Sequence, residues 1–261
     1  MFTDDIGRQI KLKSKINRIV SLVPSITELL FDLGLTSELV ACTNYCKYPK
    51  DKVGNLLKVG GTKDFDLDII RQVKPELIIA VKEENNRELV LEIAKEFPTI
   101  VFDIVNLKSA LRSIKLIGEI VSKEKEAESL LAEIDSEILK LKNKRPKTKK
   151  TVAYLIWHKP MMSVNTETYI SDIIVLSAYS NVFDKQKENY FEFTEEELKA
   201  KKPNYIFLSS EPFKFTEKHK QAYQKQYPDS KVVLVDGEMF SWYGSRLLKA
   251  ISYFKELNSD R

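Results

Sequence analysis

The sequence predicts a protein of two α/β lobes joined by one long helix, with a ligand cleft between the lobes. Three observations support this prediction. Short apolar and β-branched runs alternate with amphipathic stretches along the 261 residues, which is typical of parallel sheets covered by helices. A pattern of helix, proline and strand occurs twice at one fixed offset. Between the two copies lies an apolar stripe long enough for a helix of roughly 30 Å.

Seven runs are predicted as strands because most are apolar on both faces, as expected of parallel strands buried between helices. These runs are Ile19–Val23, Leu39–Thr43, Leu77–Val81, Thr99–Ile104, Val152–Trp157, Tyr205–Ser209 and Val232–Val235. Ser25 and Glu28 have the spacing of a capping box, and Gly34 is predicted to end the helix that follows. The first residues differ, because Asp5 to Arg8 has the composition of a tight turn in a small edge hairpin.

The repeated pattern consists of an N-capping residue, a short helix, a proline and a strand. Asp66 and Pro75 mark the first copy, and Thr194 and Pro203 mark the second, so both positions are offset by 128 residues. A helix-stopping proline before a buried strand also arises by chance. The same spacing in both halves nevertheless indicates two similarly built lobes.

One long surface helix is predicted between the halves. From Ser122 to Lys144, apolar residues recur at intervals of three and four while Glu and Lys fill the other face, which indicates a helix of about 20 residues that limits hinge motion. The expected domains are residues 1–107 for the first lobe, 108–147 for the connecting helices and 148–261 for the second lobe. The basic run Lys140 to Lys150 is interpreted as a solvated linker, since no aromatic residue interrupts it.

The composition argues against several function classes. Basic residues exceed acidic ones by only 4, and this dispersed excess does not indicate nucleic acid binding. No apolar run approaches the roughly 20 residues of a membrane span, and the N-terminus shows no leader pattern. We expect a monomer without membrane insertion. It would be cytoplasmic as written, and periplasmic or at the cell surface if a leader has been removed.

Motifs of catalysis and metal binding are missing from the sequence. There is no glycine-rich dinucleotide or phosphate loop and no nucleophile elbow, so a non-enzymatic protein is expected. His158 and His219 are the only histidines, which argues against a multi-histidine metal centre. Cys42 and Cys46 have no histidine neighbours, and we interpret them as one core residue and one loop residue.

Aromatic and sulfur-containing side chains follow three predicted strands, at the edge where open α/β sheets bind ligands. Such side chains suit a flat apolar ligand that also needs a few polar groups for orientation. The candidates are Tyr45 and Tyr48, then Trp157, His158, Met161 and Met162, and finally Phe240, Trp242, Tyr243 and Arg246. The last group has three aromatics within four residues, which loops seldom gather for packing alone.

Residues 18–35, 45–49 and 59–80 and the chain from Thr151 onward resemble the helical-backbone substrate-binding proteins of ABC importers. The resemblance extends from about Asp4 to Leu257. It is closest to the cobalamin-binding branch, which also includes siderophore and heme binders. It implies no intrinsic cofactor, a metal-containing chelate as ligand and an ABC permease as partner. A corrinoid is the first expectation, and heme and a ferric siderophore are the alternatives.

The resemblance also implies roles for single residues. Tyr45 matches the tyrosine that packs on the corrin ring, and Phe240 to Arg246 matches the loop that closes over the ligand. In that loop, Arg246 would hold an acidic or amide rim of the ligand. Met161 and Met162 fall near an aromatic contact of the cobalamin binders, and Thr62 falls where those proteins have a tryptophan.

The alternative ligands imply other contacts. For heme, the candidate axial ligands are His158 first, and Met161, Met162, Tyr45 and Tyr243 as alternatives. For a catecholate siderophore the candidate cations are Lys63 and Arg246. The family docks on its permease through one glutamate per lobe, and the candidates are Glu83 or Glu84 and Glu211 or Glu217. Two rival functions stay open: an intracellular protein or enzyme that handles the same cofactor, and a protein that binds another protein through the aromatic loop.

Overall fold

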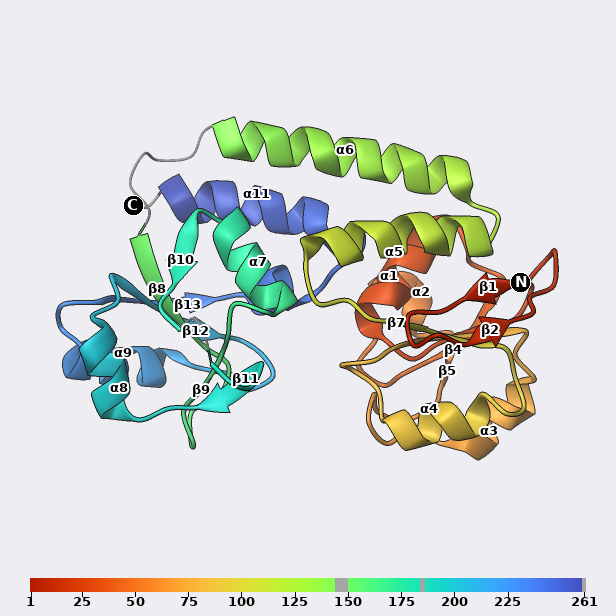
Figure 1. Ribbon diagram of the computed structural model, residues 1–261, viewed down its shortest axis with the longest axis horizontal. Helices are drawn as coiled ribbons and strands as arrows, with labels where there is room; N and C mark the ends of the chain where they lie inside the picture. The colour runs from red at the N-terminus through yellow and green to blue at the C-terminus, as the bar shows by residue number, and fades with distance from the viewer. Residues whose placement is uncertain (144–149, 184–185, 260–261) are drawn as a thin grey trace. The chain divides into compact units, whose positions relative to one another are not determined.

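The computed structural model describes residues 1–143, 150–183 and 186–259, and these divide into two compact units. Unit 1 comprises residues 1–104, 108–134 and 242–247, and unit 2 comprises residues 105–107, 135–241 and the chain from Leu248 onward. Each unit has its own parallel sheet (Figure 1), so the predicted α/β class is confirmed. The segment Trp242–Leu247 belongs to unit 1 and not to the second lobe, where the sequence places it. The predicted boundary at residues 147 and 148 lies outside the described residues.

Unit 1 contains a five-stranded parallel sheet of order β5-β4-β3-β6-β7. Its strands and helices are β3 Ile19–Ser21, α1 Pro24–Asp32, β4 Leu39–Cys42, α2 Lys50–Val53, β5 Leu57–Lys58, α3 Leu67–Val73, β6 Leu77–Val81, α4 Arg87–Ile93, β7 Thr99–Phe102 and α5 Leu107–Ile120. Helices α3 and α4 lie on one face of the sheet, and α1 and α5 lie on the other (Figure 1). Ile70 of α3 and Ile93 of α4 join Val20, Ile78 and Val101 in one buried cluster, and each such side chain contributes about 1.5–3 kcal/mol.

Unit 2 contains a four-stranded parallel sheet of order β10-β8-β12-β13 and a small antiparallel sheet of β9 and β11. Its strands and helices are β8 Lys150–Leu155, β9 Met162–Val164, α7 Tyr169–Leu176, β10 Tyr179–Asn181, β11 Tyr190–Glu192, α8 Glu195–Lys201, β12 Tyr205–Ser209, α9 Glu217–Gln226, β13 Lys231–Val235, α10 Glu238–Ser241 and α11 Arg246–Ser259. All seven predicted strands are present. The unpredicted β5, β9, β10 and β11 have two or three residues each, too few for a hydrophobic pattern.

The internal repeat is confirmed by the structure. Helix α8 and strand β12 begin and end 128 positions after α3 and β6. The side chains of Asp66 and Thr194 cap the two helices, and Lys74 and Lys202 end them in the left-handed conformation, each with φ 44°. The same cap, helix length and helix end in both copies show that the two units share this building block.

Helix α1 differs from the prediction at its first turn. Its N-cap is Val23, without a side-chain cap, and Pro24 occupies the first helical position, where the missing proline N–H costs nothing. The predicted capping box of Ser25 and Glu28 is therefore wrong. The end of the helix is as expected, because Gly34 has φ 86° and its N–H donates to the carbonyl of Phe31 at 2.9 Å.

The long helix α6 runs over Glu124–Asn143, 20 residues, close to the predicted range. Its apolar stripe is buried at Ala127, Ile134 and Leu141, as the spacing predicts. Of the predicted basic linker, Lys140 lies in α6 and pairs with Glu137, while residues 144–149 lie outside the described residues. In the described parts of the chain, no helix has the length and apolar character that crossing a bilayer requires.

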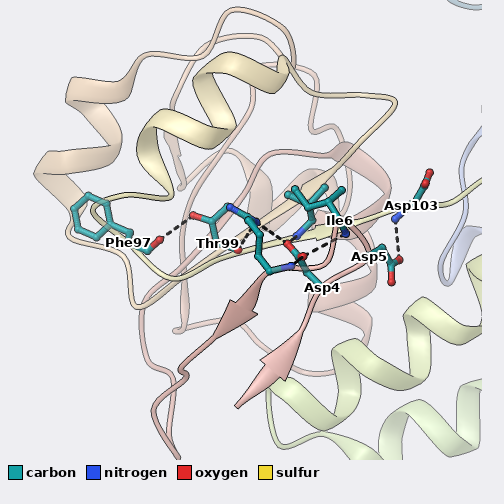
Figure 2. A network of polar contacts seen from close by, with 8 residues as sticks. Asp4, Asp5, Ile6, Phe97, Thr99 and Asp103 are labelled. Carbon is teal, nitrogen blue, oxygen red and sulfur yellow. Dashed lines mark hydrogen bonds and ion pairs between the residues drawn. The ribbon is translucent and has the colours of Figure 1, made fainter.

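The predicted N-terminal hairpin forms between β1 Phe2–Thr3 and β2 Gln9–Ile10, and the buried carboxylate of Asp4 fixes its turn. Asp4 accepts hydrogen bonds from the N–H groups of Ile6, Arg8 and Val101. It also accepts two from the Arg8 guanidinium, at 3.0 and 2.7 Å. Figure 2 shows Asp4 at the centre of this network. The hairpin is thereby attached to β7, an edge strand of the unit 1 sheet.

Three further contacts extend the network. Asp5 accepts from the N–H of Asp103 at 2.9 Å, and the hydroxyl of Thr99 donates to the carbonyl of Phe97 at 3.0 Å (Figure 2). The guanidinium of Arg8 also donates to the carbonyl of Thr99 at 2.8 Å. The hairpin therefore contacts both ends of β7.

Asp4→Ala is expected to lower the free energy of unfolding by about 3 kcal/mol, because it leaves a guanidinium and several N–H groups without their acceptor. Asp4→Asn keeps one oxygen and should lose less. The measurement is urea unfolding followed by circular dichroism, with Asp51→Ala, an exposed aspartate of α2, as the control. A loss for Asp4→Ala no larger than that of the control would show that the network does not stabilise unit 1.

Candidate functional site

Tyr45 lies in a tight turn that follows β4. The N–H of Cys46 donates to the carbonyl of Thr43 at 3.2 Å and closes the turn. The Tyr45 side chain is 57% exposed, and a Cβ atom at Gly61 would lie 3.3 Å from its ring carbon Cε2. The turn therefore presents an aromatic ring to solvent while its backbone is fixed.

Asn85 holds the strand-end loops of unit 1 together. Its Oδ1 accepts from the N–H of Val81 at 2.8 Å, and its Nδ2 donates to the carbonyls of Leu22 at 2.9 Å and Thr62 at 3.0 Å. The residue is 4% exposed. One amide thus connects three chain segments at the carboxyl edge of the sheet. The sequence gives no specific signal for this role, since asparagine after a strand also marks ordinary turns.

The loop that contains Thr62 is fixed a second time by Lys63. The Lys63 ammonium donates to the backbone carbonyl of Glu83 at 2.7 Å and to that of Asn85 at 3.4 Å. Thr62 itself is half-buried. Lys63 was expected as a cation for an acidic chelate, and the structure shows that it also joins two loops.

Arg246 forms a buried ion pair. Its Nε donates to Oε2 of Glu28 at 2.7 Å, and both side chains are 3% exposed. The guanidinium carbon lies 4.0 Å from the ring centroid of Tyr48, within the range of a cation–π contact. The expectation that Arg246 holds the rim of a ligand is not supported, because its guanidinium is buried in unit 1 and paired with the carboxylate of Glu28.

Trp242 and Tyr243 are also buried, at 8% and 4% exposure. Trp242 meets Tyr48 edge to face with a centroid distance of 5.9 Å, and the Tyr243 hydroxyl donates to Oε1 of Glu84 at 3.1 Å. Burial and the charge of Glu84 raise the pKa of Tyr243. The following Gly244 has φ 79°, and a Cβ there would lie 3.3 Å from atoms of α1. This close approach to α1 explains why glycine is needed in the loop.

The second group of candidates lies in unit 2. Trp157 pairs with Met162 in an antiparallel bridge, and its indole N–H donates to the carbonyl of Lys159 at 3.2 Å. Trp157 is 38% exposed, whereas Met161 packs against the hydrophobic core of this unit. The hairpin therefore offers the indole of Trp157 and a half-buried Met162 to solvent.

His158 belongs to an aromatic cluster. Its Nδ1 lies 3.2 Å from the hydroxyl of Tyr223, and its ring centroid lies 4.9 Å from that of His219 and 5.9 Å from that of Phe213. Burial, followed by the charge of His219, lowers the pKa of His158. The ring is thus held through Nδ1, and only Nε2 could serve a metal.

Phe240 is a core residue. It is fully buried and packs on Tyr154 and Phe254 with centroid distances of 5.1 and 5.0 Å, so the prediction that it contacts a ligand is not supported.

The two glutamates predicted for docking in unit 2 have partners within the unit. Glu211 accepts from the hydroxyl of Ser241 at 2.7 Å, and Glu217 pairs with Lys220 at 3.4 Å.

The structure brings nine predicted residues together in unit 1 and places the rest in unit 2. Unit 1 holds Tyr45, Tyr48, Thr62, Lys63, Glu83, Glu84, Trp242, Tyr243 and Arg246. Among the described residues, Tyr45 and Trp157 are the aromatic residues that are more than one third exposed. A cavity of about 410 Å³ in unit 1 is lined by Ile6, Arg8 and Asn85 among others, but by none of the predicted ligand contacts.

The chain is similar to proteins that are named for periplasmic binding, for vitamin B12 and for heme. The family model described as periplasmic binding protein matches residues 19–228. The vitamin B12-binding protein of Pectobacterium carotovorum is 23% identical over 237 residues, 89% of this chain and 85% of that protein. The vitamin B12-binding protein BtuF of Vibrio cholerae matches with a TM-score of 0.76 and 22% identity, over 92% of this chain and 95% of its own. The heme-binding protein RhuT of Roseiflexus sp. RS-1 gives 0.79 and 18%, over 92% and 97%.

Proposed function

Because the chain belongs to the periplasmic binding protein family, we propose that it binds a corrinoid of the cobalamin type and presents it to an ABC permease. Family membership assigns it to the non-enzymatic binding components of transport. The corrinoid is supported by the names of its relatives, since the Pectobacterium protein and BtuF are both named for vitamin B12. The proposal implies a location outside the cytoplasmic membrane, as BtuF and RhuT are named periplasmic.

The exposed ring of Tyr45 is the observation that carries the proposal. A corrin is a broad ring whose faces can pack on aromatic side chains, and such packing contributes about 0.5–1.5 kcal/mol beyond the burial of area. The turn is closed between Thr43 and Cys46, and the N–H of Asn44 donates to the carbonyl of Gly60 at 2.7 Å. A ring on a fixed turn loses little conformational entropy when a ligand binds.

Heme is the second candidate, and one observation favours it. The imidazole of His158 contacts the Tyr223 hydroxyl through Nδ1. Histidines that ligate metals are usually oriented in this way, by a hydrogen bond at the other ring nitrogen. The residues present therefore fit an axial ligand through Nε2, and RhuT is named for heme.

The permease contact is assigned to acidic side chains on each unit. The candidates stay Glu83 or Glu84 in unit 1 and Glu211 or Glu217 in unit 2. Glu217 is exposed, whereas the other three are half-buried. Its pairing with Lys220 is a surface contact that stabilises the helix little, so Glu217 could exchange this partner for an arginine of a permease at small cost.

Tyr45→Ala is expected to weaken cobalamin binding about tenfold or more, because it removes both stacking and buried area. Purified protein is titrated with cyanocobalamin while tryptophan fluorescence is followed. Leu139→Ala, which shortens an exposed side chain on α6, serves as the control and should bind like the parent. Equal affinities of Tyr45→Ala and the parent for cyanocobalamin would show that Tyr45 does not contribute to the binding site.

The same titration distinguishes between the three candidate ligands. Hemin and a ferric catecholate are added in parallel with cyanocobalamin, and Trp157→Phe identifies the quenched indole. Binding of hemin with a Soret band that changes in His158→Ala, and no binding of cyanocobalamin, would favour heme. Absence of any response to the three chelates would contradict the proposed function.

A further inference from the structure

Cys42 and Cys46 form a pair of neighbouring thiols in unit 1. Cys42 ends β4 and is fully buried, and Cys46, across the Tyr45 turn, is 4% exposed. The hydrogen bond from the N–H of Cys46 to the carbonyl of Thr43 folds the chain back on β4, and each thiol affects the pKa of the other. The sequence interpretation is confirmed in that Cys42 is a core residue and Cys46 lies in a loop, and the structure adds that Cys46 is buried as well.

Polar groups surround this pair of thiols. The ammonium of Lys58 donates to Sγ of Cys42 at 3.2 Å. The hydroxyl oxygens of Thr27 and Thr43 lie 3.1 and 3.3 Å from Sγ of Cys46. A structural cysteine in an apolar core needs no such partners, whereas a cation and hydroxyls favour the thiolate.

The surroundings shift the pKa values of the two thiols in opposite directions. The neighbouring Cys42, then the hydroxyls of Thr27 and Thr43 and the charge of Lys58, lower the pKa of Cys46 to about 6. The pKa of Cys42 is raised by Cys46 and by burial. Cys46 is therefore the more acidic thiol of the pair.

We propose that Cys42 and Cys46 are a redox-active pair that closes to an intramolecular disulfide when a small peroxide reaches Cys46. The burial of both residues favours a water-sized oxidant over a bulky disulfide. The resulting bond would tie the Tyr45 turn covalently to β4. This inference is independent of which chelate the protein binds.

The reaction uses two sulfurs and one peroxide. The Cys46 thiolate attacks one oxygen of hydrogen peroxide, the O–O bond breaks, and hydroxide leaves and takes up a proton to become water. Sγ of Cys42 then attacks Sγ of the Cys46 sulfenic acid, the S–O bond breaks, and the oxygen leaves as a second water with the Cys42 proton. The two thiols lose two electrons and the peroxide gains them.

The test compares alkylation before and after oxidation. The full chain is reduced, freed of reductant and exposed to hydrogen peroxide, then unfolded with an alkylating reagent and weighed by mass spectrometry. We expect both alkylation sites to vanish together, a mass lower by two hydrogen atoms than that of the reduced chain, and full recovery with dithiothreitol. Two alkylated cysteines after peroxide, or one cysteine that gains oxygen while the other stays alkylatable, would overturn the proposal.

Single variants identify the attacking sulfur. Cys42→Ser should stop at the Cys46 sulfenic acid, which dimedone traps, while Cys46→Ser should leave Cys42 unreacted. Lys58→Met should slow disulfide formation about fivefold or more, because less thiolate is present, and Lys50→Met on α2 should not change the rate. The reverse dimedone pattern, or equal rates for the two lysine variants, would contradict the proposed route.

Discussion

The variant Arg246→Met is expected to unfold with a free energy about 3 to 5 kcal/mol below that of the parent, because it leaves the buried carboxylate of Glu28 without its cation. The ion pair is 2.7 Å long and both side chains are 3% exposed, so water cannot replace the guanidinium. The loss of the contact with the Tyr48 ring adds to the effect. Chemical unfolding followed by circular dichroism measures it.

A second variant tests whether the loss comes from the unpaired charge. Glu28→Leu combined with Arg246→Met removes both charges, and most of the stability should return because no buried ion remains uncompensated. Arg71→Met is the control, since Arg71 pairs with Glu96 on the surface and should change stability little. If the double variant is as unstable as Arg246→Met, packing of the arginine stem and not its charge explains the loss.

Much of the fold could be predicted because its signals are local. A cap, an amphipathic turn, a proline and a β-branched run all lie within about fifteen residues, so the pattern at Asp66 and its copy at Thr194 reveal both units. The 20-residue stripe of α6 is equally local. The strands that escaped prediction are too short to show a period, and β9 and β11 are defined by their mutual pairing and not by composition.

Which of the predicted site residues are exposed was harder to predict, because exposure depends on distant partners. Ser25 and Glu28 have the spacing of a capping box, yet Glu28 binds Arg246, 218 positions away. The aromatic residues Phe240, Trp242 and Tyr243 were expected to contact a ligand and are buried in packing. Tyr45 and Trp157, chosen by the same reasoning, have exposed rings. The sequence pattern indicates which residues lie near strand ends, but it does not show which of them are buried in the core.

The role of Asn85 could not be predicted from the sequence. Replacing this residue tests whether its amide stabilises the strand-end loops of unit 1. Asn85→Ala is expected to lower the free energy of unfolding by about 2 to 4 kcal/mol, because it leaves the buried N–H of Val81 and the carbonyls of Leu22 and Thr62, one buried and one half-buried, without their partner. Asn86→Ala is a matched control at the next position. Asn86 caps α4 through the N–H groups of Glu88 and Leu89, and the loss of such a cap costs about 1 kcal/mol.

Asn85→Asp should be worse than Asn85→Ala at pH 7. The carboxylate can still accept from Val81, but its second oxygen would face the carbonyls of Leu22 and Thr62 where the parent has a donor. Burial and these carbonyls would raise the pKa of the new carboxyl above its unfolded value of about 3.9. The penalty should therefore grow as pH rises from 4 to 7 and shrink again on acidification, when the protonated acid can donate to one carbonyl. A pH-independent penalty, equal to that of Asn85→Ala, would mean that the amide does not donate to these two loops and that another group positions Thr62.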